Sequence, residues 1–344
     1  MGHDLIVIGA SAGGIEALSE LISRLPQDLA ACICVVQHLS PYHESFLARI
    51  LSSAGHLQAS FASAGDALTE GHIYIAPPDR HLIVDGQRLQ VVMGPRENNF
   101  RPAVDALFRS AALAQRERVV GVVLSGALDC GTAGLLAVKR CGGVALVQDP
   151  DEAMVPDMPR SAIENVPVDA VLPIHAIATK LVELSRTPAR PRARAAAPAL
   201  VEQETKIDRM APEAEVLPPP GEPAGLTCPN CAGPLYELSD GPQLRFRCRV
   251  GHGFSGPALS AEQQNTTEGA FWAALRALEE QAALARRLAT RARELGQKRS
   301  VASFEERAVA AEHQARVVRE ELLKSLTPRD DAETTSERTN SIKH

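Results

Sequence analysis

The chain has 344 residues, 45% of them hydrophobic, and a formal net charge of −6 from 36 basic and 42 acidic side chains. This length suffices for one α/β domain with smaller appended modules. The negative charge gives no overall attraction to nucleic acid or anionic lipid, so we expect no nucleic-acid partner. Since no run of about 18 uncharged apolar residues occurs, we also expect no membrane insertion. The first residues lack a secretory leader pattern, which predicts a cytoplasmic location.

Residues 1–185 alternate between short apolar runs and segments with helical apolar spacing. Asp85 and Gly86 separate two apolar runs, 82–84 and 88–92, and this dipeptide favours a tight hairpin turn. Alternating strands and helices predict an α/β fold with a doubly wound, mostly parallel sheet, here with an inserted antiparallel hairpin. The other expected elements are strands at 4–10, 31–39, 73–76, 119–125, 143–148 and 169–172, and helices at 15–25, 46–51, 104–115, 132–140, 159–164 and 175–185.

The remaining chain changes character three times. Residues 186–225 are rich in proline, alanine and arginine, which predicts a disordered linker. Residues 226–256 contain a cysteine cluster, and 257–326 have the apolar spacing of a helical hairpin or coiled-coil stem. The polar residues 327–344 predict a disordered tail.

Glycines surround a serine where the first expected strand meets the first helix. The spacing Gly9-x-Ser11-x-Gly13 fits a nucleophile elbow, a sharp turn that presents a serine hydroxyl at the end of a strand. A dinucleotide-binding loop is the competing interpretation, but it requires glycine where Ser11 stands. It also requires an acidic residue at the end of the second strand, which ends instead in Gln37 and His38. Because the carboxyl ends of neighbouring parallel strands meet at one edge, Ser11 and His38 are candidates for a nucleophile and its base.

Several ordered blocks resemble the catalytic domain of the chemotaxis protein-glutamate methylesterases, the CheB family. The resemblance covers roughly residues 4–185 and implies hydrolysis of glutamate methyl esters, and often glutamine deamidation, on the cytoplasmic helices of chemoreceptors. A receiver domain, usual at the N-terminus of this family, is not expected because Ser11 comes so early. The matching blocks are residues 8–14, 36–39, 71–77, 101–105, 124–135, 148–150 and 158–162.

Carried over by position, the resemblance makes Ser11 the nucleophile and His38 the base. The family motif L-[ST]-G-x-x-x-D-G aligns its aspartate with Cys130, whereas Asp129 stands one residue earlier. A neutral thiol cannot stabilise an imidazolium, so Asp129 is the hypothesised acid, with helix capping as its alternative role. The oxyanion hole is expected from the backbone amides of Ala12 and Ala127.

Cys228, Cys231, Cys248 and His252 have the spacing C-x2-C and C-x3-H. Four soft or imidazole ligands of this kind are typical of a tetrahedral zinc site, here in a module that resembles a zinc ribbon. A site closed by four protein ligands has a structural role, and no cofactor is expected for catalysis.

The sequence therefore predicts a serine-dependent carboxylic ester hydrolase, a protein-glutamate methylesterase of a chemosensory system. Its expected partners are methylated chemoreceptor helices, with a cognate receptor methyltransferase as a further candidate. The C-terminal helices are candidates for self-association. The displaced acid keeps one alternative open, a catalytically weak or inactive regulatory and interaction module.

Overall fold

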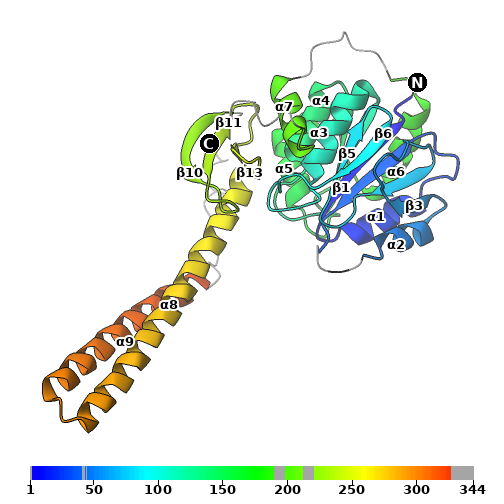
Figure 1. The fold of residues 1–344 in the computed structure, drawn as a ribbon. Coiled ribbons are helices and arrows are strands. Elements are labelled where there is room, and N and C mark those ends of the chain that lie inside the picture. The colour runs from blue at the N-terminus through cyan, green and yellow to red at the C-terminus, as the bar shows by residue number, and fades with distance from the viewer. Residues whose placement is uncertain (1, 41–42, 44, 190–197, 212–220, 327–344) are drawn as a thin grey trace, which may run out of the picture. The chain divides into compact units, whose positions relative to one another are not determined.

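The computed structural model describes residues 2–40, 43, 45–189, 198–211 and 221–326. Its centre is a seven-stranded sheet in which all neighbouring strands are parallel (Figure 1). The prediction of a doubly wound α/β fold is thereby confirmed. The strands, in their order across the sheet, are β3 (Gln58–Phe61), β4 (His72–Ile75), β2 (Cys32–Gln37), β1 (Leu5–Ala10), β7 (Val119–Val123), β8 (Val144–Gln148) and β9 (Ala170–Leu172).

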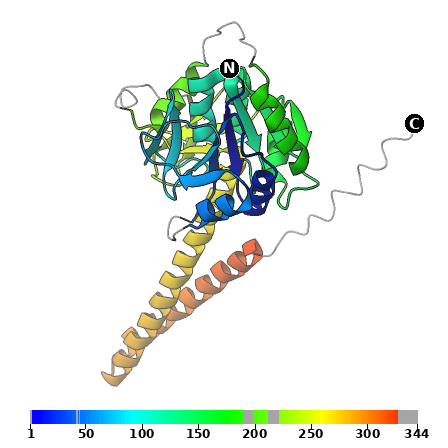
Figure 2. The same ribbon diagram turned by 90° about the vertical axis from the view of Figure 1, so that its right-hand side faces the viewer.

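Both faces of the sheet are covered by helices (Figure 2). Side chains alternate along a strand, so Ile6 and Ile8 of β1 pack on one face while Leu5 and Val7 pack on the other. One face carries α1 (Gly14–Ser23), α2 (Leu47–Ala54) and α6 (Ile174–Arg186). The other face carries α3 (Val104–Gln115), α4 (Thr132–Arg140) and α5 (Asp157–Asn165), together with the hairpin of β5 (His81–Asp85) and β6 (Arg88–Val92). A short 3-10 helix, η1 (Arg116–Arg118), precedes β7.

The chain reverses its direction of winding at β1. Strand β2 lies on one side of β1 and β7 on the other, although β7 comes much later in the chain. In open parallel sheets, such a switch point leaves a crevice beyond the carboxyl ends of the strands. The segments that leave β1, β2 and β7 therefore meet at one place.

Two elements follow the α/β domain within the same compact unit, which spans residues 1–260. Helix α7 (Ala199–Asp208) lies in the span for which the sequence predicts a disordered linker. This helix is held in place and is not a disordered linker, because its buried residues Glu204 and Asp208 form ion pairs with arginines. Residues 222–225 of that span belong to a strand, while its segments 190–197 and 212–220, like the predicted tail at 327–344, lie outside the described residues. The cysteine module forms an antiparallel sheet of β10 (Glu222–Thr227), β11 (Pro234–Leu238), β12 (Arg245–Cys248) and β13 (Gly253–Ser255), which we call the ribbon.

Six buried charged side chains, which we call the ion cluster, join the α/β domain to α7 and the ribbon. Each is at most 6% exposed. Arg109 of α3 pairs with Asp208 at 2.7 Å and with Glu97, while Arg247 of β12 pairs with Glu204 at 2.9 Å. Burial alone would raise the pKa of Glu97, but Arg109 and Arg247 lower it instead, so the carboxylate stays ionised. The six members are Glu97, Arg109, Glu204, Asp208, Arg245 and Arg247.

The described residues from 261 to 326 form a separate unit. Helices α8 (Gly256–Glu294) and α9 (Lys298–Leu326) run antiparallel and side by side in Figures 1 and 2. Small side chains repeat at intervals of three and four along the shared seam, the spacing of a coiled coil. The buried seam residues are Leu275, Ala282, Ala285, Ala289 and Ala292 of α8 and Ala308, Ala311, Ala315 and Leu322 of α9. Among the described helices, none is both long and apolar enough to cross a membrane.

Replacing Arg247 by Ala should strongly destabilise the unit of residues 1–260. The change leaves Glu204 and Asp208 with fewer partners in a dry interior, which typically costs about 3–5 kcal/mol. Urea unfolding followed by circular dichroism measures the loss. Arg249→Ala is the matched control, since that arginine is exposed two residues away. Equal midpoints for the two variants would contradict a stabilising role for the ion cluster.

Candidate active site and metal centre

Ser11 lies immediately after β1, where the backbone turns sharply into α1. Gly13 adopts a left-handed φ of 72°, which glycine reaches without strain. The amide of Ser11 donates a 2.9 Å hydrogen bond to the carbonyl of Ser125, beyond β7. A Cβ atom at Gly126 would lie 2.8 Å from the Cβ of Ser11, so only glycine permits this close approach. The sequence feature interpreted as an elbow is therefore a tight strand-to-helix turn braced by the neighbouring strand.

His38 follows β2 and reaches the serine. Its Nδ1 atom lies 3.0 Å from the Oγ atom of Ser11. Both side chains line a cleft of about 560 Å³, whose wall also includes Arg96, Phe100 and Arg101. The structure thus brings together the two residues that the sequence places at the ends of β1 and β2.

The environment of His38 favours a neutral imidazole. Burial lowers its pKa to about 3, because a charged ring would lose its hydration. Its Nε2 atom is buried and has no hydrogen-bond partner among the described residues. One face of the ring stacks on Phe100, with ring centroids 3.7 Å apart and planes 5° from parallel. The neutral His38 can therefore accept a proton at Nδ1, and its ring packs against the face of Phe100.

Asp129, the hypothesised acid, is directed to the ribbon. Its carboxylate accepts hydrogen bonds from Ser255 Oγ at 2.6 Å and from Gln243 Nε2 at 2.8 Å. Burial raises its pKa, and these two hydrogen bonds partly oppose the shift. No hydrogen bond joins it to His38 within the part of the chain that the structure describes. A left-handed φ of 59° at Leu128 turns the chain just before it, and after this turn the carboxylate meets Ser255 and Gln243.

Cys130, which stands at the aspartate position of the motif, is a buried thiol. Burial, reinforced by the charge of Asp105, raises its pKa well above the usual range. The backbone amides of Val104 and Asp105 oppose this shift without cancelling it. Cys130 therefore stays uncharged at neutral pH and supplies no counter-ion to an imidazolium.

The expected oxyanion donors are two backbone amides. Those of Ala12 and Ala127, in the turns after β1 and β7, donate no hydrogen bond among those recorded between described residues. The turns themselves are tied together, because Ser125 Oγ donates to the carbonyl of Ala12 at 2.7 Å. The oxyanion hole expected from these two amides stays a prediction.

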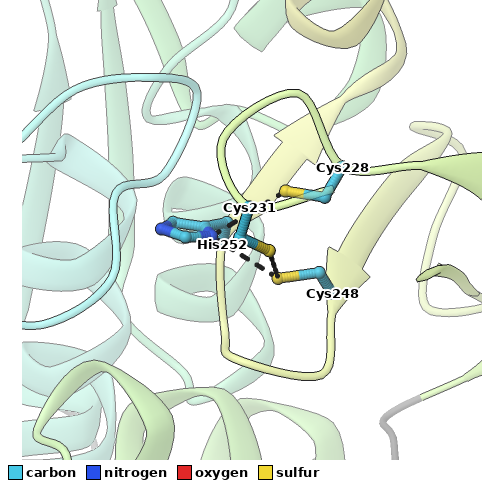
Figure 3. Close-up of side chains that lie close together, drawn as sticks. All are labelled: Cys228, Cys231, Cys248 and His252. Atoms are coloured by element: carbon cyan, nitrogen blue, oxygen red, sulfur yellow. Dashed lines mark hydrogen bonds between the residues drawn. The ribbon is translucent and has the colours of Figure 1, made fainter. Parts of the chain in front are cut away.

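The four predicted metal ligands converge in the ribbon (Figure 3). Their ligand atoms all lie within 4.8 Å of one another. The Sγ atoms of Cys231 and Cys248 are 3.7 Å apart, and His252 Nδ1 lies 3.5 Å from Cys248 Sγ and 3.8 Å from Cys228 Sγ. Tetrahedral zinc with Zn–S bonds of about 2.3 Å requires sulfur atoms roughly 3.8 Å apart, so the four residues fit such an ion.

Sequence reasoning missed one neighbour of His38 and both partners of Asp129. Phe100 stacks on His38, and Ser255 and Gln243 hold Asp129. The ribbon residues carry no sequence signal, since they lie more than 110 residues from Asp129 along the chain. Phe100 directly precedes the 101–105 block of the family resemblance, which was the one available hint.

A parallel α/β sheet with a serine and a histidine at adjacent strand ends is typical of hydrolytic enzymes. The comparisons narrow this class. A family model described as CheB methylesterase matches residues 6–181, about half of the chain. The chain belongs to this family, which confirms the resemblance seen in the sequence.

Named relatives and a solved structure agree with this family. A Leptospira interrogans protein, described as a candidate protein-glutamate methylesterase/protein-glutamine glutaminase, is 36% identical over 187 residues, which cover 54% of this chain and 97% of that protein. The Thermotoga maritima protein-glutamate methylesterase/protein-glutamine glutaminase is 38% identical over 184 residues, covering 52% of this chain and 54% of that one. The crystal structure of the Thermotoga maritima CheB methylesterase catalytic domain is 36% identical, with a TM-score of 0.51, and covers 53% of this chain and 98% of that domain.

Proposed function

We propose that this protein is a protein-glutamate methylesterase that hydrolyses glutamate methyl esters on methylated chemoreceptor helices, with Ser11 as nucleophile and His38 as base. The observation that carries the proposal is the 3.0 Å contact between Ser11 Oγ and His38 Nδ1 inside an open cleft of the family domain. Glutamine deamidation follows the same acyl chemistry with ammonia as the leaving group, and the names of the relatives include it.

The reaction proceeds in two halves. Ser11 Oγ attacks the ester carbonyl while its proton passes to Nδ1 of His38, and the oxyanion is held by the amides of Ala12 and Ala127. His38 then returns the proton to the methoxide, which leaves as methanol and gives a glutamyl ester on Ser11. Water attacks this ester, again with His38 as base, and the proton returned to Ser11 regenerates the enzyme with a free glutamate.

We propose that the pair of Ser11 and His38 carries this chemistry and that Asp129 serves the contact with the ribbon. Its two hydrogen bonds to Ser255 and Gln243 support this role. The same contacts, together with the neutral Cys130, favour a second candidate function, a catalytically weak module with mainly regulatory tasks. The two candidates differ in whether Ser11 supports turnover.

The cysteine and histidine cluster supports a structural zinc ion. Cys228, Cys231, Cys248 and His252 would fill all four positions of a tetrahedral ion, so no position is left for substrate or water. When bound, zinc supplies a cross-link between the two loops of the ribbon rather than chemistry. A methyltransferase partner and self-association through the C-terminal helices remain predictions.

Replacing Ser11 by Ala should reduce methanol release by at least about 10³-fold, because no other group provides the acyl acceptor. The measurement is single-turnover release of methanol from a helical peptide that carries a glutamate γ-methyl ester. Ser19→Ala is the matched control, a serine of α1 whose Oγ donates to the carbonyl of Ile15 in its own helix. Equal release by the parent and Ser11→Ala would refute serine catalysis and favour the regulatory alternative.

Replacing Asp129 by Asn should change the rate of methanol release by less than about threefold and lower stability. Loss of a charged acceptor for Ser255 and Gln243 typically costs about 1–3 kcal/mol. Thermal unfolding and the peptide assay together measure both effects. Ser255→Ala, which removes one of the same hydrogen bonds, should show a similar loss of stability. A fall in rate near 10⁴-fold for Asp129→Asn would instead identify it as the triad acid.

Elemental analysis of the purified chain should find one zinc ion per molecule. Joint replacement of Cys228 and Cys231 by Ser should remove it, since two neutral hydroxyls do not replace thiolates. Cys141→Ser, a buried cysteine of the α/β domain, should keep the metal. A metal-free parent protein would contradict the zinc assignment.

A further inference from the structure

We propose that Phe100 is a positioning residue for His38, and that strands β12 and β13 of the ribbon hold Phe100 in place through the turn at residues 97–100. The inference rests on the proposed function, because it explains how the base of that reaction is oriented. It assigns the ribbon a part in catalysis that a structural zinc module does not have by itself.

The catalytic histidine of a serine hydrolase needs a group that fixes its ring. In a triad this group is a carboxylate that bonds the second ring nitrogen. Here the second nitrogen of His38, Nε2, has no partner among the described residues, and Asp129 bonds the ribbon. The near-parallel stack with Phe100 fixes the plane of the ring, and the bond to Ser11 fixes its edge. Two constraints of this kind define the orientation without a carboxylate.

The turn that carries Phe100 is tightly closed. Asn98 and Asn99 adopt left-handed φ angles of 50° and 66°, a conformation that asparagine tolerates better than most residues. Backbone hydrogen bonds join Glu97 and Phe100 in both directions, at 3.2 and 2.9 Å. Consecutive positive φ angles between two such bonds are the pattern of a type I′ turn. The position of Phe100 therefore follows directly from the position of Glu97 and Asn98.

The ribbon contacts this turn through two hydrogen bonds and one ion pair. The amide of Asn98 donates to the carbonyl of Gly253 at 2.8 Å, and its Oδ1 atom accepts from the amide of Ser255 at 2.7 Å. The carboxylate of Glu97 lies 3.3 Å from Arg247 in the ion cluster. A side chain at position 253 would press on Glu97, since its Cβ would lie 3.1 Å from Glu97 Cγ. A continuous set of contacts thus runs from β12 and β13 through the turn to His38 and Ser11.

The stack with Phe100 also stabilises the positive charge that His38 gains during the reaction. When His38 accepts the proton of Ser11 at Nδ1, the imidazolium lies over the face of Phe100. The negative face of an aromatic ring attracts a cation placed over it within about 6 Å, and the centroids here are 3.7 Å apart. The remaining charged groups at the cleft are Arg96 and Arg101, the latter paired with Asp79 at 2.8 Å. The two arginines do not stabilise an imidazolium, so Phe100 is the group that does so among the described residues lining the cleft.

The first test compares Phe100→Leu with Phe100→Tyr in the full chain loaded with zinc, using the methyl-ester peptide. Phe100→Leu removes the stack and should lower kcat by roughly 10–100-fold, the usual cost of a misplaced catalytic group, with KM within about twofold. Phe100→Tyr keeps the ring and should retain kcat within about threefold. Equal kcat values for parent and Phe100→Leu would overturn the proposal.

The pH profile separates positioning from general damage. Burial holds the pKa of His38 at about 3, so the parent should keep a neutral base down to low pH. Removing the ring over its face admits water and also removes its attraction for the imidazolium. Because burial is what depresses this pKa, hydration is the larger effect, and the pKa should rise toward the ordinary value of about 6.5. The acid limb of kcat should therefore move to higher pH in Phe100→Leu and stay in place in Phe100→Tyr. An unmoved limb in Phe100→Leu, even with reduced kcat, would count against positioning.

The second test addresses the ribbon. Asn98→Gly removes the bond to Ser255 while glycine still accepts the left-handed φ, and it should lower kcat in the same direction as Phe100→Leu. The two changes should be less than additive in the double variant, because they act through one contact path. Gln243→Ala, which removes a ribbon hydrogen bond to Asp129 rather than to the turn, should leave kcat unchanged. Full additivity, or an equal loss in Gln243→Ala, would refute the ribbon's part.

A spectroscopic measurement keeps the inference separate from the proposed function. The ring current of Phe100 should shift the His38 ring protons upfield in NMR spectra, and the shift should vanish in Phe100→Leu and shrink in Asn98→Gly. This result does not depend on the substrate. If Ser11→Ala releases methanol like the parent, the proposed function fails, whereas a missing ring-current shift in the parent overturns the positioning role alone.

Discussion

The ion cluster is the interaction on which the arrangement of the first 260 residues depends. Three arginines and three carboxylates from α3, α7, β12 and the turn at residues 97–100 balance one another in a dry interior. Apolar packing tolerates small shifts, but buried charges need nearly every donor and acceptor matched, since an unpaired one is costly. The cluster therefore fixes how α7 and the ribbon seat on the α/β domain. The position of the ribbon in turn fixes the position of Glu97, which is the first residue of the turn at 97–100 that carries Phe100 to the active site.

Much of the α/β domain follows from local sequence. Runs such as 119–123 are apolar throughout because parallel strands are buried on both faces, and the pair Asp85 and Gly86 marks its hairpin directly. Ser11 and His38 were predictable for a related reason. Each ends a buried strand, and parallel strands bring their carboxyl ends to a common edge. Strand β3 was missed because its half-buried residues at the sheet edge lack a continuous apolar run.

The contacts that complete the site were not predictable from the same signals. Helix α7 has only a weakly apolar face, and its fixed position comes from Glu204 and Asp208, residue types that are rarely buried. Asp129 was assigned to the histidine because it stands next to the motif position, yet its partner Ser255 lies 126 residues later. A pattern of residues shows which chemistry is available. It does not show which of two distant polar partners a carboxylate meets.

A histidine base can be held by its edge or by its face. A carboxylate on the edge also stabilises the protonated ring strongly, but it holds the pKa of the ring higher in exchange for that charge pairing. A phenyl face fixes the plane of the ring, keeps it dry, and offers the imidazolium a weaker attraction. A base built in this way stays neutral over a wide pH range but is a poorer proton acceptor. The enzyme would then depend on whatever keeps the aromatic ring in place, and in this chain the contacts to that turn come from β12 and β13, the strands joined by the loop between Cys248 and His252.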